Sequence, residues 1–190
     1  RVGECSGGRE PLVPQVRPAV VPLSYAQQRL WFLDQLEGPS PVYNMAVALR
    51  ITGGLNVDAL GEALVDVVGR HESLRTVFRS VDGVAEQVVV PAGEADFGWQ
   101  LIDAVGWSMV ELREAIEAVA GYMFDLSAEV PLQARLFRVG GDEFVLAGVV
   151  HHIAADGWSV TPLVADLQAA YTARCGGQAP QWAPLPVQYV

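Results

Sequence analysis

Basic residues are scarce in this chain, and their scarcity excludes one class of function. The 190 residues include 12 Lys and Arg against 22 Asp and Glu, which gives a net charge of −10. A nucleic-acid-binding surface needs clustered cationic side chains, and no basic cluster interrupts the acidic balance. Nucleic acid is therefore not an expected partner.

Long apolar runs are also missing. No stretch of about 18 apolar residues occurs, and the N-terminus lacks a charged region followed by an apolar one. Neither a membrane span nor a signal peptide is predicted, and we expect a cytoplasmic location.

Cysteine is rare as well, because only Cys5 and Cys175 are present. Without metal-ligand spacing they predict neither a zinc site nor a disulfide framework, so we expect two free thiols. A metal site built from His151, His152 and Asp156 is disfavoured too, because adjacent histidines rarely face one ion and no third clear ligand stands nearby. No metal is expected.

What the chain does have is apolar content, at 51% hydrophobic and 18% charged residues. This composition suits a packed α/β core. It also leaves more apolar surface than a free-standing soluble protein usually shows, and a partner that covers some of that surface is one explanation. The high apolar content therefore has two explanations, a well-filled core and a surface that a partner covers.

Local patterns divide the chain into a leader and a series of helices and strands. Residues 1–20 are rich in glycine and proline without periodicity and are predicted to be a linker. Capping-box pairs at Ser24 with Gln27 and at Ser108 with Glu111, and a cap at Asn56, predict helix starts. Asp82-Gly83 predicts a hairpin turn. The expected helices are 24–36, 56–70, 108–124 and one from Pro162 to Gly176; the expected strands are 43–51, 74–81, 84–90, 132–139 and 143–150.

The segment 151–158, HHIAADGW, is the most informative part of the sequence. It follows the apolar run 144–150, which predicts a strand buried on both faces that ends in two histidines. Adjacent residues of an extended chain point to opposite sides, so one imidazole is expected to face a given cavity. Because histidine titrates near neutrality, such a ring can accept a proton during group transfer.

Three segments together resemble the condensation domains of nonribosomal peptide synthetases. HHIAADG at 151–157 is similar to the HHxxxDG signature, SYAQQRLWFL at 24–33 to SxAQxRLWxL, and RHESLRTVF at 70–78 to RHExLRTxF. The three occur in the family's order. The resemblance covers residues 20–190 and stops where the family's next signature, YxDYAxW, would begin, so we expect residues 21–190 to be the N-terminal lobe of a domain whose C-terminal lobe is absent.

This resemblance implies a fold and a reaction. The fold is α/β (α+β), a chloramphenicol acetyltransferase-like lobe with a mixed sheet flanked by helices. The reaction is amide formation between two aminoacyl or peptidyl thioesters tethered through phosphopantetheine to upstream and downstream carrier domains, next to an adenylation domain. No cofactor is expected on this chain, and the isolated lobe is expected to be inactive.

The resemblance also implies roles for single residues. His152 is the expected catalytic imidazole, as a general base or as a group that positions the amine, with His151 as its structural support. Asp156 is expected to form an ion pair with Arg75; Arg70 is the competing partner, and a triad of Asp156 with His152 ranks below both. Gly157 is expected to allow close approach of substrate or positive φ.

Trp158 and Ser159 are expected to line the path of the pantetheine arm, although packing is an equal explanation for Trp158. The sequences of the motifs resemble those of domains that join an L-configured donor to an L-configured acceptor. His151 and the sequence after Asp156 disfavour heterocyclization and epimerization domains. A stand-alone CoA-dependent acyltransferase and a non-catalytic carrier-docking module remain the alternatives.

Overall fold

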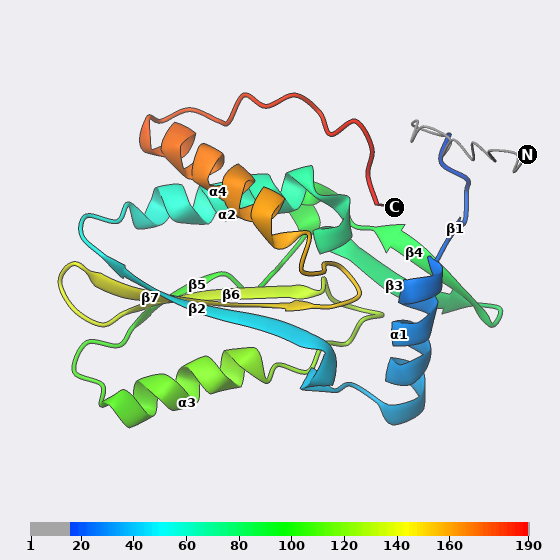
Figure 1. The fold of residues 1–190 in the computed structure, drawn as a ribbon, viewed down its shortest axis with the longest axis horizontal. Helices are drawn as coiled ribbons and strands as arrows, with labels where there is room; N and C mark the ends of the chain where they lie inside the picture. Colours follow the sequence, from blue (N-terminus) through cyan, green and yellow to red (C-terminus); the bar gives the residue numbers. More distant parts are fainter. Residues whose placement is uncertain (1–15, 190) are drawn as a thin grey trace, which may run out of the picture.

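The computed structural model describes residues 16–189. Most of the expected linker, together with Cys5, lies outside these residues. Four α-helices and two β-sheets make up the described part of the chain (Figure 1). The helices are α1 (Tyr25–Glu37), α2 (Val57–Arg70), α3 (Met109–Ala120) and α4 (Val160–Cys175), with short 3-10 turns η1 (Pro41–Tyr43), η2 (Glu72–Arg75) and η3 (Ala92–Glu94).

The larger sheet has four strands in the order β2-β7-β6-β5, and the smaller has three in the order β1-β4-β3. Strands β5 and β6 are parallel and all other pairs are antiparallel, so the expected mixed sheet is confirmed. The strands are β1 (Val21–Pro22), β2 (Asn44–Thr52), β3 (Thr76–Val81), β4 (Val84–Val89), β5 (Gln100–Asp103), β6 (Leu132–Arg138) and β7 (Glu143–His151).

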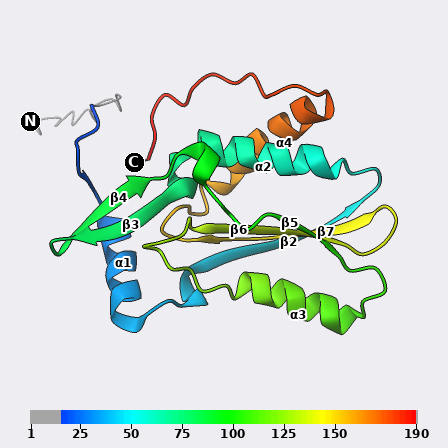
Figure 2. The same ribbon diagram turned by 180° about the vertical axis from the view of Figure 1, so that it is seen from behind.

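The larger sheet is covered on both faces. Helices α2 and α4 lie on one face and α3 on the other, while α1 and the β1-β4-β3 sheet stand at one end (Figures 1 and 2). Alternate residues of β7 serve the two cores: Val145 and Val149 pack on the α3 side, whereas Phe144 and Leu146 pack with Leu60 of α2 on the other side. This two-sided burial explains the nearly continuous apolar run in β7.

Several predicted helix starts and turns are confirmed. Ser24 and Ser108 both form complete capping boxes, with Gln27 and Glu111 as their partners. The hairpin β3-β4 turns at Asp82-Gly83 with φ of 51° and 79°, as a two-residue hairpin turn requires.

Helix α3 ends earlier than the sequence predicts, at Ala120 rather than near residue 124. The carbonyls of Ala120 and Tyr122 accept hydrogen bonds from Nδ2 of Asn44, at 2.9 and 2.8 Å. Because these carbonyls bind a side chain from β2, they do not continue the helix. Met123 consequently lies exposed beyond the helix and does not belong to its apolar face.

The two shortest strands were not predicted. β1 has two residues and β5 has four, too few to show an alternating pattern. Strand β2 forms where it was predicted, but its burial does not alternate. It is an edge strand of the sheet, residues 46–50 are all exposed, and Val47 and Leu49 are about half exposed.

Candidate active site

The end of β7 separates the two histidines as expected. The amide of His151 donates to the carbonyl of Pro131 at 3.0 Å, and the amide of His152 donates to the carbonyl of Tyr43 at 2.8 Å. β7 ends at His151, and His152 is the first residue of a turn that the amide of Ala154 closes on the carbonyl of His151 at 3.0 Å. His151 is 3% exposed, whereas His152 is exposed and lines a cavity.

His151 is packed as a neutral support. Its ring stands edge-on to the rings of Tyr43 and Phe124, with centroids 6.3 and 6.2 Å away. Its Nδ1 accepts a hydrogen bond from the amide of Ile153 at 3.2 Å. Burial lowers the pKa of His151 from 6.5 to about 4, and the neighbouring His152 adds to this shift. The ring is therefore uncharged at neutral pH, with its proton on Nε2.

Asp156 binds within its own loop. Its Oδ1 accepts from the amide and the hydroxyl of Ser159, at 2.9 and 2.7 Å, and its amide donates to the same hydroxyl at 3.1 Å. The hydrogen bond from the Ser159 hydroxyl is the main cause that lowers the pKa of Asp156 below its usual value. The paired residues close the loop directly before α4, so this loop is shaped by local bonds.

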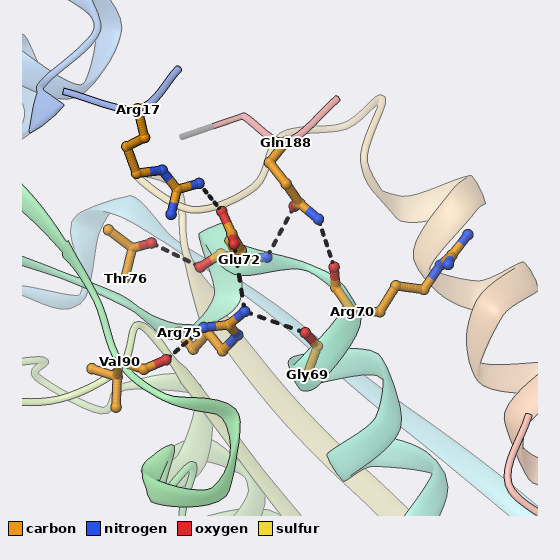
Figure 3. Close-up of polar contacts among 8 residues, drawn as sticks. All are labelled: Arg17, Gly69, Arg70, Glu72, Arg75, Thr76, Val90 and Gln188. Atoms are coloured by element: carbon orange, nitrogen blue, oxygen red, sulfur yellow. Dashed lines mark hydrogen bonds and ion pairs between the residues drawn. The ribbon is translucent and has the colours of Figure 1, made fainter. Parts of the chain in front are cut away.

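The expected ion pair between Asp156 and Arg75 is wrong. Arg75 donates to the carbonyl of Val90 at 2.6 Å and to that of Gly69 at 3.4 Å, and it lies 3.7 Å from Glu72 (Figure 3). These acceptors hold its guanidinium at the corner between η2 and the end of β4. Asp156 meanwhile accepts from Ser159, while Nε of Arg75 stays buried without a hydrogen-bond partner in the part of the chain that the structure describes.

Arg70, the competing partner, does not pair with Asp156 either. Its Nε donates to Asp166 of α4 at 2.8 Å. The expectation that Asp156 orients His152 in a triad is also wrong in this structure, because the side chain of Asp156 accepts its side-chain hydrogen bonds from Ser159 and forms none with His152.

A cavity of about 620 Å³ opens at His152 and collects all three motif segments. Helix α1 contributes Arg29 and Leu30, and the turn after α2 contributes His71 and Ser73. The loop after β7 contributes residues 152–156 and Ser159. The cavity wall consists of Ala26, Arg29, Leu30, Tyr43, His71, Ser73, His152, Ile153, Ala154, Ala155, Asp156, Ser159, Pro162, Leu163, Leu185, Val187, Gln188 and Tyr189. Segments far apart in the sequence therefore form one site.

The C-terminal segment supplies a wall that sequence reasoning missed. The side chain of Gln188 accepts from the amide of Glu72 at 3.2 Å and donates to the carbonyl of Arg70 at 3.0 Å (Figure 3). The hydroxyls of Tyr189 and Ser24 are 3.0 Å apart. No periodicity in this proline-rich stretch indicated that it would line a site. Its contacts depend on the folded positions of α1 and η2.

The comparisons with known proteins agree with the motif segments. The family model described as "Condensation domain" matches residues 18–190. The chain belongs to the condensation-domain family. It is 63% identical over 180 residues to "Isonitrile lipopeptide synthase" of Mycobacterium tuberculosis, covering 95% of this chain and 7% of that protein. It is 49% identical over 173 residues to "Dimodular nonribosomal peptide synthase" of Bacillus subtilis, covering 91% and 7%.

Solved structures show the same fold. The X-domain in "Complex of the X-domain and OxyB from Teicoplanin Biosynthesis" is similar with a TM-score of 0.86 and 37% identity, over 96% of this chain and 39% of that chain. A starter condensation domain of the rhizomide synthetase RzmA has a TM-score of 0.78 and 23% identity, over 87% and 40%, and shows the fold alone. The expected chloramphenicol acetyltransferase-like fold is confirmed. The chain spans well under half of each of these relatives.

Two expected loop residues of this condensation-domain chain lie outside the cavity wall. Trp158 is 90% exposed, so its side chain does not pack against residues 16–189, and the packing explanation for it is wrong within this part of the chain. Gly157 does not have positive φ, and a Cβ added there would meet no atom within 4 Å. The positive-φ part of its expected role is therefore wrong, while close approach of substrate stays a prediction.

Within residues 16–189 no group of three or more His, Cys, Asp or Glu is placed to hold a metal ion. Over the same residues no helix is both long enough and apolar enough to cross a bilayer. Cys175 is exposed and is not in a disulfide.

Proposed function

We propose that this chain is the histidine-bearing lobe of a domain that forms an amide between two carrier-tethered acyl groups. The amine of an acceptor aminoacyl thioester attacks the thioester carbonyl of a donor. The C–N bond forms as the C–S bond breaks, the thiol of the donor's phosphopantetheine arm leaves, and the amine loses one proton. The chain itself needs no bound cofactor for this reaction, because both arms arrive on the carriers.

One observation carries the proposal: the three motif segments meet at a single cavity with the exposed His152 in its wall. The amide of His152 is held by its hydrogen bond to the carbonyl of Tyr43, so its backbone has a defined place directly after the strand. There it binds the attacking amine and accepts its proton. Holding two tethered reactants together supplies much of the acceleration as well.

The loop residues support His152 in this proposal. Asp156 and Ser159 shape the loop through their mutual hydrogen bonds, and both also belong to the cavity wall. His151 remains neutral and anchors the strand end from its buried side. Trp158 and Gly157 lie on the exposed part of the loop, where an arriving pantetheine arm would contact them.

The missing second lobe completes the proposal. Large apolar side chains are exposed on α1, at Tyr25, Phe32 and Leu36, and on α4, at Val164. Such a set needs a covering partner, and the chain spans only 39% of its X-domain relative. We assign the covering role to a C-terminal lobe, which also closes the channel between the two carriers. Alone, the chain would leave His152 open to water and would not turn over.

The wider setting follows the named relatives. The domain would work in a cytoplasmic synthetase between an upstream and a downstream carrier domain, next to an adenylation domain. The sequences of the motifs support an L-configured donor and an L-configured acceptor.

Product formation from two loaded carrier domains, followed by mass spectrometry, tests the proposal. The complete domain should form the amide, and the 190-residue chain alone should not. His152→Ala in the complete domain should abolish product while its unfolding midpoint stays near that of the parent. Arg113→Ala, an exposed change on α3, is the matched control and should leave turnover unchanged.

Near-normal turnover by folded His152→Ala would refute the role of His152. Equal turnover by the chain alone would show that the site is complete within these residues and would refute the half-domain proposal.

A docking role is the second candidate, because the X-domain relative was solved in complex with a second protein, OxyB. It predicts tight carrier binding by the complete domain without product formation. The same assay, combined with a binding measurement, separates the two functions.

A further inference from the structure

A second imidazole lines the cavity together with His152. His71 directly follows α2, at the start of the RHESLRTVF segment, and belongs to the same cavity wall. The chain has three histidines, so two of them border this one cavity and the third, His151, is buried beneath it. The proposed chemistry uses only His152, which leaves the role of His71 open.

The ring of His71 is held firmly by α4. Its Nε2 lies 2.7 Å from Oδ2 of Asp166, and the Nε of Arg70 donates to the same oxygen at 2.8 Å. The three side chains are only 13 to 21% exposed. A shared, partly buried carboxylate oxygen therefore fixes the position of the ring.

Arg70 is itself anchored by the C-terminal segment. Its Nη1 donates to the carbonyl of Ala183 at 2.7 Å, and its guanidinium carbon lies 4.6 Å from the ring centre of Trp182. Its own carbonyl accepts from Gln188 (Figure 3). The same carboxylate oxygen of Asp166 that accepts from this anchored guanidinium also faces Nε2 of His71 as a hydrogen-bond acceptor.

The hydrogen bond to Asp166 selects one tautomer of the neutral His71 ring. In that tautomer Nε2 carries the hydrogen that it donates to Asp166, and Nδ1 holds a lone pair. Within residues 16–189 no group forms a hydrogen bond with this Nδ1, and the atom is not among the buried atoms that lack a partner. In His151, by contrast, the amide of Ile153 occupies Nδ1. His71 therefore presents an unoccupied acceptor at the cavity wall.

We propose that His71 is a substrate-positioning residue that accepts a hydrogen bond, through Nδ1, from an N–H group of the bound acyl substrate. Asp166 and Arg70 are the residues that position it. This inference rests on the proposed amide-forming function. The N–H group belongs either to the amine of the acceptor or to an amide of its pantetheine arm.

Two variants of His71 separate positioning from a purely structural brace. His71→Gln keeps an N–H donor that can reach Asp166 but has no acceptor in place of Nδ1. His71→Asn places a carbonyl oxygen near the position of Nδ1 but cannot reach Asp166. In the complete domain, His71→Gln should unfold near the parent midpoint yet lose about 3- to 10-fold in kcat/KM for the acceptor. His71→Asn should unfold earlier and keep more of kcat/KM. Arg113→Gln is the control.

Two forms of acceptor identify the N–H group. One is an aminoacyl group on its carrier domain, and the other is the same aminoacyl group as an S-ethyl thioester, which has none of the arm's amides. A loss with both acceptors identifies the amine, and a loss only with the carrier-bound acceptor identifies the arm. Parent-like kcat/KM of His71→Gln with both acceptors would overturn the proposal.

A spectroscopic readout keeps the inference separate from the proposed reaction. With ¹⁵N-labelled histidine, the 190-residue chain has three rings, each assignable by one variant. His71 should show the Nε2–H tautomer, and the aminoacyl thioester of pantetheine, which carries both the amine and the amides of the arm, should shift its Nδ1 resonance. If the complete domain makes no product, the proposed function fails, but these spectra still decide the role of His71. An Nδ1–H tautomer, or an unchanged resonance, would overturn it.

Discussion

Acidification should destabilise this chain through His151 in particular. The ring is 3% exposed, and its pKa falls from 6.5 to about 4 because burial disfavours the charged form. Between these two values the unfolded chain binds a proton at this residue and the native chain does not. Native stability is therefore complete above pH 6.5 and decreases as the pH falls towards 4.

The size of the effect follows from the shift. Each pH unit in this window costs about 1.4 kcal/mol, so the full loss is about 3 kcal/mol. A domain of ordinary stability has about 5 to 15 kcal/mol in total, so the loss is easily measured. Carboxylates with lowered pKa values, such as Asp103 and Asp125, lose their contribution below their usual range and act mainly at still lower pH.

Urea unfolding of the chain at several values between pH 7 and pH 4.5 measures this loss. His151→Asn keeps an acceptor for the amide of Ile153 but cannot titrate. It should be less stable than the parent at pH 7, and its stability should change less on acidification. His152→Asn removes the neighbour that adds to the shift but leaves the burial of His151, which is the larger cause, so it should keep most of the parental pH dependence. Parallel curves for the parent and His151→Asn would refute the assignment of the acid sensitivity to this ring.

Two further predictions use stability measurements. Alanine substitutions of Arg75 and Asp156 should be additive within about 0.5 kcal/mol in denaturant unfolding, because the two residues bind different partners; a coupling well above that value would restore the ion pair between them. Gly98→Ala should lower the free energy of unfolding by at least about 1 to 3 kcal/mol, since Gly98 has φ of +64° and an added Cβ would lie 2.0 Å from Oε1 of the buried Gln133. Gly54→Ala is the control, because a Cβ there meets no atom within 4 Å. Equal thermal midpoints for the two variants would contradict this reasoning.

Local patterns in the sequence were sufficient for most of the secondary structure. Both capping boxes and the Asp82-Gly83 turn depend on a few neighbouring residues, so they form as predicted. The prediction was wrong where a distant partner intervened. Helix α3 ends early because Asn44 of β2 binds the carbonyls of Ala120, its last residue, and of Tyr122 just beyond it. Strand β5 exists because β6 pairs with it.

The candidate site shows the same division. The apolar run of β7 predicted that His151 and His152 would separate at a strand end, since alternation is a property of any extended chain. The choice of arginine partner was wrong, because several carboxylates and carbonyls lie within reach of Arg70 and Arg75 and only their folded positions select among them.

The sequence by itself determined the family, the order of the three motif segments and the strand end that carries His152, because each of these depends on residues close together in the chain. Only the tertiary structure decided that His71 and the C-terminal segment border the same cavity as His152. Such contacts join residues far apart in sequence, and they follow from the packing of α1, α2 and α4 around the sheet rather than from any local pattern.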